Sequence, residues 1–288
     1  MDLHNCVYIL PVRVKRMHVA SIGLYIVTSF AVIFFNKLVV SIFAFTSVAF
    51  IMLCRAIFTT LCLIPMAKQI QKPTKDIMFL SFLNVSNLLF TLLTNKNMSI
   101  PMATSLRRFS IFTTMMAQYP NVPDNILYSV LVMVLGSLIT CFDNFQFNTL
   151  GFIFVSVSNV LTTCIHLQTK KTLSANVNKI SILFWSAVLS IAVDGTVLAT
   201  FTPKTFEDWN TESFQFVFAM SVVLGFCMNY SSTWVLEKNN ALTLAVAIVV
   251  KNLLFDGMLL FYYTGSSTEI AGTVISTIGA LSYIYHKS

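Results

Sequence analysis

Three basic residues lie inside stretches of the chain that are otherwise apolar enough to cross a lipid bilayer. Arg107 and Arg108 lie within residues 102–118, and Lys251 lies within residues 241–262. A basic side chain at mid-membrane costs about 2.5–3.5 kcal/mol, so it normally faces a wet cavity lined by protein. Fixed positive charge in such a cavity binds anions. The sequence therefore predicts a carrier for an anionic solute that bears phosphate.

Lys251 and Asn252 are the strongest candidates for substrate binding. The lysine ammonium is a compact point charge that suits a phosphate, and the asparagine amide can hydrogen-bond a sugar or the edge of a base. The alternative is a structural ion pair between Lys251 and an acid inside the membrane, Asp194 or Asp256. Asp256 lies about 140° round the helix from Lys251, so a pair within that helix is poor.

Arg107 and Arg108 are neighbours, so on a helix they point about 100° apart and cannot face one cavity equally. One is expected to bind substrate while the other pairs with an acid or extends toward the membrane interface. Arg108 is the expected substrate residue, because it lies near the middle of residues 102–118 and Lys251 lies in a similar place within residues 241–262. Arg55, inside another apolar stretch, is predicted to bridge helices, to gate the carrier or to touch substrate.

A second group of candidates is aromatic or carries an amide or hydroxyl. Trp185, in the run Phe184–Ser186, has a ring that could stack on a nucleobase; ordinary aromatic packing is the alternative. Asn84 and Asn87 lie three residues apart on one helix face and suit either a cavity or hydrogen bonds between helices. Tyr230, in a similar polar run, has the same two interpretations.

The composition is that of a membrane protein. Hydrophobic residues make up 56% of the 288 residues and charged residues only 10%, with a mean hydropathy of +0.79. A soluble domain carries about 25% charged residues. The net charge of +7 does not indicate nucleic-acid binding, because no basic helix or arm lies outside the apolar stretches. Membrane topology explains the charge better.

No enzyme motif is present. The sequence has no P-loop, GxSxG or HExxH pattern, and its four histidines lie at the ends of apolar stretches or in the tails. The six cysteines show no CxxC spacing, so buried free thiols are expected rather than metal ligands or disulfides. We therefore expect no catalytic residue, no metal and no cofactor.

Ten membrane spans of about 20 residues each are predicted to position these side chains. The chain is thus predicted to be an all-α membrane protein with a single domain over residues 1–288. The loops are alternately rich and poor in Lys and Arg, and the positive-inside rule then places both termini in the cytosol. The predicted spans are 18–36, 44–66, 77–95, 101–118, 125–142, 149–168, 179–201, 214–235, 241–262 and 266–285.

Ten spans divide into two repeats of five, residues 18–142 and 149–285. An odd number of spans per repeat places the two in opposite orientations, as in transporters built from inverted repeats. Two related helices, one carrying Arg108 and the other Lys251, then offer positive charge to a shared site at mid-membrane. Chance similarity between apolar sequences is the alternative.

Four segments resemble eukaryotic nucleotide-sugar transporters, in the same order along the chain. Residues 97–111 (NMSIPMATSLRRFSI) are similar to LSLPMFTVLRKFTI of that family, and residues 144–171 to FNLEGYIFVFLNDIFTAANGVYTKQK. Residues 240–252 (NALTLAVAIVVKN) are similar to SALTTAVVGAIKN, and residues 183–187 (LFWSA) stand where the family has LFYNA. The resemblance covers most of the chain. The nearest branch handles UDP-glucuronate, UDP-N-acetylgalactosamine and UDP-N-acetylglucosamine.

This resemblance implies a ten-helix fold of the drug/metabolite transporter superfamily, in the membrane of the Golgi or the endoplasmic reticulum. It implies antiport by alternating access, in which a cytosolic nucleotide sugar enters the lumen and a nucleoside monophosphate leaves. The expected partners are these two solutes and membrane lipid, without nucleic acid. A homodimer is left open.

The motifs that read the substrate in the GDP-mannose branch are altered in this chain. Phe184–Ala187 stand in place of FYNN and Ile248–Asn252 in place of GALNK, so Trp185 and Ser186 occupy the positions of Tyr and Asn. A GDP-mannose carrier is therefore disfavoured, and a UDP-sugar is the expected substrate. Two further alternatives are a sugar-phosphate/phosphate exchanger of the triose-phosphate type and a paralogue that does not transport.

Overall fold

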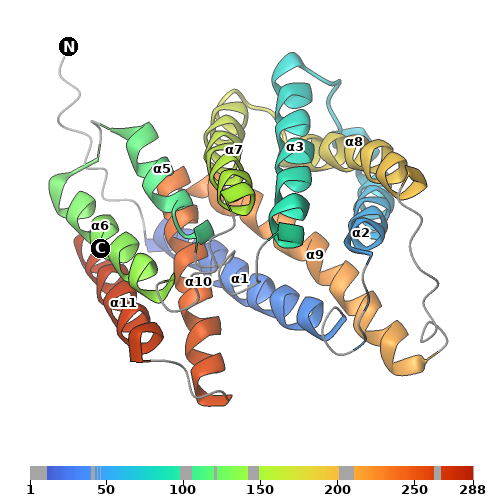
Figure 1. The fold of residues 1–288 in the computed structure, drawn as a ribbon. Helices are drawn as coiled ribbons and strands as arrows, with labels where there is room; N and C mark the ends of the chain where they lie inside the picture. Colours follow the sequence, from blue (N-terminus) through green and yellow to red (C-terminus); the bar gives the residue numbers. More distant parts are fainter. Residues whose placement is uncertain are drawn as a thin grey trace, which may run out of the picture.

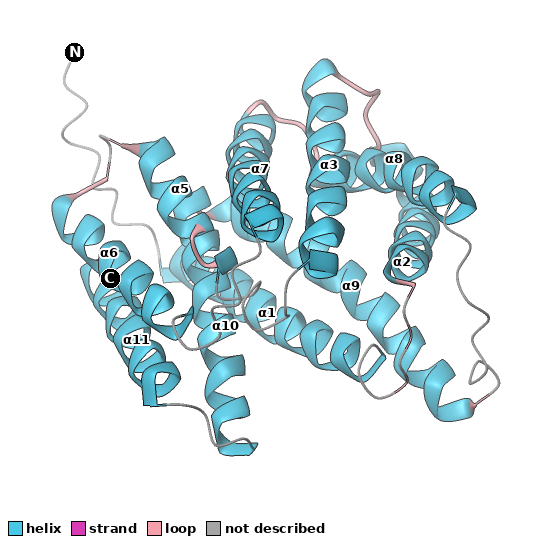
Figure 2. Cartoon of the chain, viewed as in Figure 1, coloured by secondary structure: helices cyan, strands magenta, loops and turns pink. Residues whose placement is uncertain are grey.

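The structure, a computed structural model, is built of helices. It describes residues 12–39, 43, 45, 47–97, 106–119, 122–141, 149–200, 211–262 and 267–287, and no strand occurs within these ranges (Figure 2). Ten α-helices and one 3-10 helix follow one another along this described part (Figure 1). They are α1 (Val12–Lys37), α2 (Val48–Leu63), η2 (Ile64–Gln69), α3 (Lys75–Asn97), α5 (Ser110–Gln118), α6 (Asp124–Cys141), α7 (Thr149–Ser174), α8 (Lys179–Thr200), α9 (Glu212–Lys238), α10 (Ala241–Tyr262) and α11 (Ser267–Lys287).

The predicted all-α fold is confirmed, and each predicted span overlaps a helix of the described part. Within the described ranges, five helices are long and apolar enough to cross a membrane: α1, α2 with η2, α7, α8 and α9. Large apolar side chains such as Phe82, Leu135 and Leu281 are exposed on outer faces, which suits contact with lipid chains rather than water. Ten membrane crossings stay a prediction.

The fourth helix differs from the expected continuous span. Residues 101–105 lie outside the described part, and a turn at Arg108–Phe109 precedes α5. The bond from Ile111 N–H to the Arg108 carbonyl, 3.1 Å long, has the i to i−3 pattern of a tighter helix. Asn159 of α7 donates its Nδ2 to the Leu106 carbonyl at 2.9 Å. The Leu106 carbonyl thus accepts two bonds, one from this side chain and one from the Phe109 N–H at 3.1 Å.

Helices from the first half of the chain pack chiefly on helices from the second half. α1 lies along α9 and α3 along α7, while α2 packs on α8, α5 on α10 and α6 on α11 (Figure 1). Counted in order, α7 to α11 correspond to α1, α2, α3, α5 and α6. When the halves are exchanged, the α1–α9 contact becomes the α7–α3 contact, and the other three pairs map onto themselves. Two halves related by a two-fold axis pack in this pattern.

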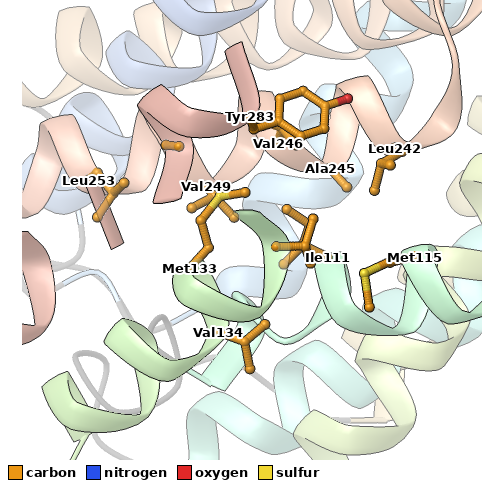
Figure 3. Close-up of a cluster of buried hydrophobic side chains, with 12 residues drawn as sticks. Ile111, Met115, Met133, Val134, Leu242, Ala245, Val246, Val249, Leu253 and Tyr283 are labelled. Carbon is orange, nitrogen blue, oxygen red and sulfur yellow. The ribbon is translucent and has the colours of Figure 1, made fainter. Parts of the chain in front are cut away.

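A buried apolar cluster joins α5 and α10 to α6 and α11. Ile111 and Met115 of α5, Met133 of α6 and Val249 of α10 converge there with Tyr283 of α11 (Figure 3). Each of these side chains is almost wholly buried. The cluster fixes α10, which carries Lys251, against the helix that follows the two arginines.

A second apolar cluster lies where α9 begins and the chain passes from α1 to α2. Phe45 contacts Phe214 and Phe218 of α9, with ring centroids 5.7 and 6.0 Å away, and Phe50 of α2 joins them. We call this part of the bundle the phenylalanine end. It joins the first half of the chain to the second, so it must rearrange if the halves separate here.

α6 and α11 approach each other closely because glycines lie between them. A Cβ atom added to Gly136 would lie 2.5 Å from the backbone nitrogen of Ser276 and 2.6 Å from the carbonyl oxygen of Gly272. A Cβ added to Gly279 would lie 2.8 Å from the backbone nitrogen of Met133. Small residues serve this purpose in membrane helices, where close backbone packing drives association.

Candidate functional site

Lys251 lies in the middle of α10 and faces α1. Its Nζ donates a hydrogen bond to the Ser29 hydroxyl at 2.7 Å and lies 5.9 Å from the centre of the Tyr25 ring, within the range of a cation–π contact. Ser29 and Tyr25 are buried, whereas Lys251 and its neighbour Asn252 are half-buried. The ammonium group is therefore held by uncharged groups of α1.

The acids considered as partners of Lys251 do not account for its position. Asp194 of α8 forms no ion pair, since the ion pairs among the described side chains all involve Glu237. The side chain of Asp256 lies outside the described part. The described contacts of Lys251 thus leave its charge unneutralised, which favours the functional interpretation over the structural one.

Arg107 supplies a second positive charge near Lys251. The two charges act on each other, and the side chain of Arg107 is only partly buried. Its Nη2 donates to the Thr91 carbonyl of α3 at 3.4 Å. Each half of the chain therefore contributes one cation, and the two are close enough for their charges to interact. Because like charges repel strongly where water is scarce, an anion between them would relieve the repulsion.

Arg108, expected to be the substrate residue, lies in a different environment. Its side chain is 1% exposed and is the largest fully buried side chain in the described part. The turn at Arg108–Phe109 breaks the helix on which the comparison with Lys251 depended. Of the two arginines, Arg107 has the more accessible side chain and acts electrostatically on Lys251.

Glutamine substitutions should separate the roles of the two arginines. Arg107→Gln is expected to weaken binding of a phosphate-bearing ligand such as UMP about 10- to 100-fold, because a hydrogen bond to a charged group contributes about 1.5–3 kcal/mol. Arg108→Gln is expected instead to lower the yield of folded protein, because a fully buried side chain is changed. Ligand-induced melting shifts and the size-exclusion profile measure the two effects. The opposite assignment would follow if Arg108→Gln folded normally and bound UMP more weakly than Arg107→Gln.

The candidates Asn84, Asn87 and Ser186 hold helices together. Asn87 of α3 donates its Nδ2 to the Thr162 hydroxyl of α7 at 3.2 Å and accepts a bond from the Ser158 hydroxyl at 2.7 Å. The Asn84 Nδ2 lies 3.4 Å from the Ser186 hydroxyl of α8. Of the two interpretations, the described contacts favour hydrogen bonding between helices.

The candidates Phe184, Trp185 and Tyr230 lie together where α8 begins and α9 approaches its end. Phe184 packs in the apolar cluster that Tyr230 borders, and the Trp185 Nε1 donates to a backbone carbonyl beyond η2 at 3.1 Å. The Lys179 ammonium lies 5.0 Å from the centre of the Tyr230 ring and 3.0 Å from a Glu237 carboxylate oxygen. No described contact joins this cluster to Lys251. Stacking of a base on Trp185 stays a prediction.

Arg55 joins three helices through buried polar contacts. Its Nη2 donates to the Asn36 Oδ1 of α1 and to the Ser221 hydroxyl of α9, the latter at 2.7 Å. The Ser221 hydroxyl in turn donates to the Asn36 Oδ1 at 2.7 Å. The Arg55 side chain crosses α9 at Gly225, where a Cβ atom would lie 2.7 Å from its Nε. We call Asn36, Arg55 and Ser221 the Arg55 latch; bridging of helices is the role that these contacts support.

Sequence reasoning missed Ser29 and Tyr25, the partners of Lys251. Both are polar residues four apart in the first span, hence on one helix face, which was the only available signal. Ser29 and Tyr25 become partners of Lys251 only because α10 lies against that face. The spacing of residues along one helix does not reveal such a tertiary contact.

Known nucleotide-sugar transporters are similar to this chain along most of its length. The chain is 28% identical over 282 residues to the UDP-sugar transporter UST74c of Drosophila melanogaster, covering 91% of this chain and 75% of that protein. It is 28% identical over 300 residues to the nucleotide sugar transporter SLC35D2 of Homo sapiens, covering 96% and 87% of the two chains. These relatives are transporters and not enzymes, which confirms the expectation from the missing enzyme motifs. No family model matches the chain.

The fold also matches a protein of known crystal structure. The TM-score is 0.74, the match covers 95% of this chain and 97% of the other, and 10% of the aligned residues are identical. At this identity the match supports the arrangement of helices and carries no information on the substrate.

Proposed function

The chain belongs to the nucleotide-sugar transporter family, and we propose that it exchanges a cytosolic UDP-sugar for a nucleoside monophosphate. The observation that carries this proposal is the position of Lys251, a cation in the middle of α10 that the described residues hold only with the uncharged groups of Ser29 and Tyr25. The phosphates of a nucleotide are the anions that such a cation suits. The names of the relatives supply the choice of a UDP-sugar among phosphate-bearing solutes.

Transport proceeds by alternating access between two inverted repeats, residues 18–142 and 149–285. The exchange-symmetric packing of α1 on α9 and of α3 on α7 supports this proposal, because repeats of this kind rock against each other around a fixed site. In the empty carrier, Lys251 and Arg107 would have to pass through a closed state without an anion. Positive charge that no anion balances is costly inside a membrane, so the carrier switches only when loaded, and transport is coupled as exchange.

The carrier resides in the Golgi or the endoplasmic reticulum with both termini in the cytosol. Lys68 and Lys72 between α2 and α3, and Lys170 and Lys171 at the end of α7, lie on the same side of the bundle in this topology, which follows from the positive-inside rule. The phenylalanine end and the Arg55 latch then close the luminal side.

Thermal stabilisation of the purified carrier by UMP, GMP, AMP, CMP and inorganic phosphate tests the substrate class. UMP is expected to raise the melting temperature most, because a ligand at 100 times its Kd stabilises the folded state by about 2.7 kcal/mol. A larger shift with GMP would favour a GDP-mannose carrier, and an equal shift with phosphate a triose-phosphate type of exchanger. No shift with any nucleotide would contradict the proposal. In vesicles, labelled UMP should leave only when the outside medium contains a nucleotide or nucleotide sugar.

A further inference from the structure

Asp194 of α8 is a buried acid to which the site described above gives no role. Its side chain is 2% exposed, and its Oδ2 has no hydrogen-bond partner among the described residues. Asp194 continues a stripe of buried residues on α8, Ile180, Leu183 and Ala187, whose spacing of three or four residues marks one helix face. An ionised carboxylate in such a place costs several kcal/mol unless it finds a partner.

α8 packs on both α2 and α3, and the residues near its start that share a face with Asp194 contact α2. Leu63, the last residue of α2, lies in one cluster with Ile180 and Leu183 near the start of α8, so the two helices run in opposite directions. Eleven residues along α8 from Leu183 is Asp194, and eleven residues back along α2 from Leu63 is Met52. At about 1.5 Å of rise per residue, Asp194 and Met52 therefore lie at similar depth.

The guanidinium group of Arg55 reaches this same depth. Side chains on a helix lean toward its N-terminus, and the Arg55 Nη1 lies 4.0 Å from the Met52 sulfur. The cation of the Arg55 latch and the carboxylate of Asp194 thus lie at one level on two helices that pack together. In the present arrangement the guanidinium turns toward α1 and α9 instead.

We propose that Arg55 changes partners during transport, leaving Asn36 and Ser221 for Asp194 when α1 and α9 separate at the phenylalanine end. The proposal rests on alternating access as the proposed function. Separation of the two helices breaks the Asn36–Ser221 bond, and Arg55 of α2 can then keep at most one of its two neutral acceptors. A buried guanidinium that loses an acceptor is destabilised. Asp194 offers a carboxylate, the stronger acceptor for arginine, and so stabilises the open state.

Exchange of labelled UMP in reconstituted vesicles tests the switch through a double-mutant cycle. Asp194→Asn and Arg55→Gln are each expected to slow exchange at least 10-fold while the affinity for UMP, read from melting shifts, is unchanged. Both changes remove the Arg55–Asp194 pair, and Arg55→Gln also removes the bonds to Asn36 and Ser221; once Arg55 is changed, the further change of Asp194 should therefore not slow exchange. Asp76→Asn is the matched control: this acid accepts a bond from the Gln168 amide at the other end of the bundle, and exchange should proceed at the wild-type rate. If Arg55→Gln does not fold, Asp194→Asn alone decides.

A second readout needs no knowledge of the substrate. In a background without native cysteines, the Ser221→Cys variant is labelled with a membrane-impermeant maleimide from either side of the membrane. Addition of Asp194→Asn should slow this labelling at least several-fold, because the open state loses its ion pair. Equal labelling rates, or wild-type exchange by Asp194→Asn, would overturn the switch. Failure of the wild-type carrier to exchange any nucleotide would contradict the proposed function instead, and the labelling rates would still decide on the switch.

Discussion

Replacement of Lys251 by methionine should abolish nucleotide exchange and leave the carrier folded. Methionine keeps an unbranched side chain of similar length but removes the charge that Ser29 and Tyr25 hold in the site. Loss of one partner of a buried ion pair costs about 3–5 kcal/mol, so the affinity for a nucleotide should fall on the order of 10²- to 10³-fold. Counterflow of labelled UMP into vesicles and the melting shift with UMP measure both consequences.

Lys171→Met provides the matched control for this substitution. It removes one lysine charge by the same chemical change, from an exposed position in the last turn of α7. Exchange by this variant should stay within about twofold of the wild type, since exposed charges contribute little. Wild-type exchange by Lys251→Met, at equal amounts of folded protein, would remove Lys251 from the site.

A single methyl group at Gly136 should destabilise the carrier. In Gly136→Ala the new Cβ would press on the backbone of α11 at Ser276 and Gly272. Flexible side chains can move aside, but here two helix backbones must separate, and overpacking costs about 1–3 kcal/mol. The melting temperature in detergent should fall by several degrees, with a smaller peak of folded protein in size-exclusion chromatography.

Gly23→Ala is the matched control for Gly136→Ala. No atom lies within 4 Å of a Cβ built at Gly23, on the outer side of α1. Alanine is a better helix former than glycine by about 1 kcal/mol, so this variant should melt at the wild-type temperature or slightly above it. Equal melting temperatures of the two variants would show that α6 and α11 do not pack as closely as described.

Apolar runs made the helices predictable, and α10 has the predicted bounds, Ala241 to Tyr262. The fourth helix was not predictable in the same way. Its turn at Arg108–Phe109 is accompanied by a bond to the Leu106 carbonyl from Asn159, a residue more than fifty positions away in the sequence. Because a helix rotates each successive residue by about 100°, one local turn changes the directions in which the two adjacent arginines point.

A site residue could be predicted from the sequence where its residue type is rare in a membrane span. It could not be predicted where that type is common in spans. A lysine inside an apolar span stands out, so Lys251 could be found from the sequence alone. Asn84 and Asn87 serve equally well in a cavity or between helices, and only the position of α7 and α8 separates these roles. Ser29 lay among many serines in the spans, and its importance comes from the contact with α10.

The buried apolar clusters among the described residues combine side chains from both halves of the chain. The most extensive helix contacts all join the first five helices to the last five, and the hydrogen bond between Thr28 and Ser231 closes across 203 positions of sequence. During synthesis, Asn36 and Arg55 are therefore in the membrane without their partner Ser221 until α9 has been made. Contacts so distant in sequence form late and slowly. The nascent first half is the stage at which this carrier depends most on the insertion machinery and is most open to degradation.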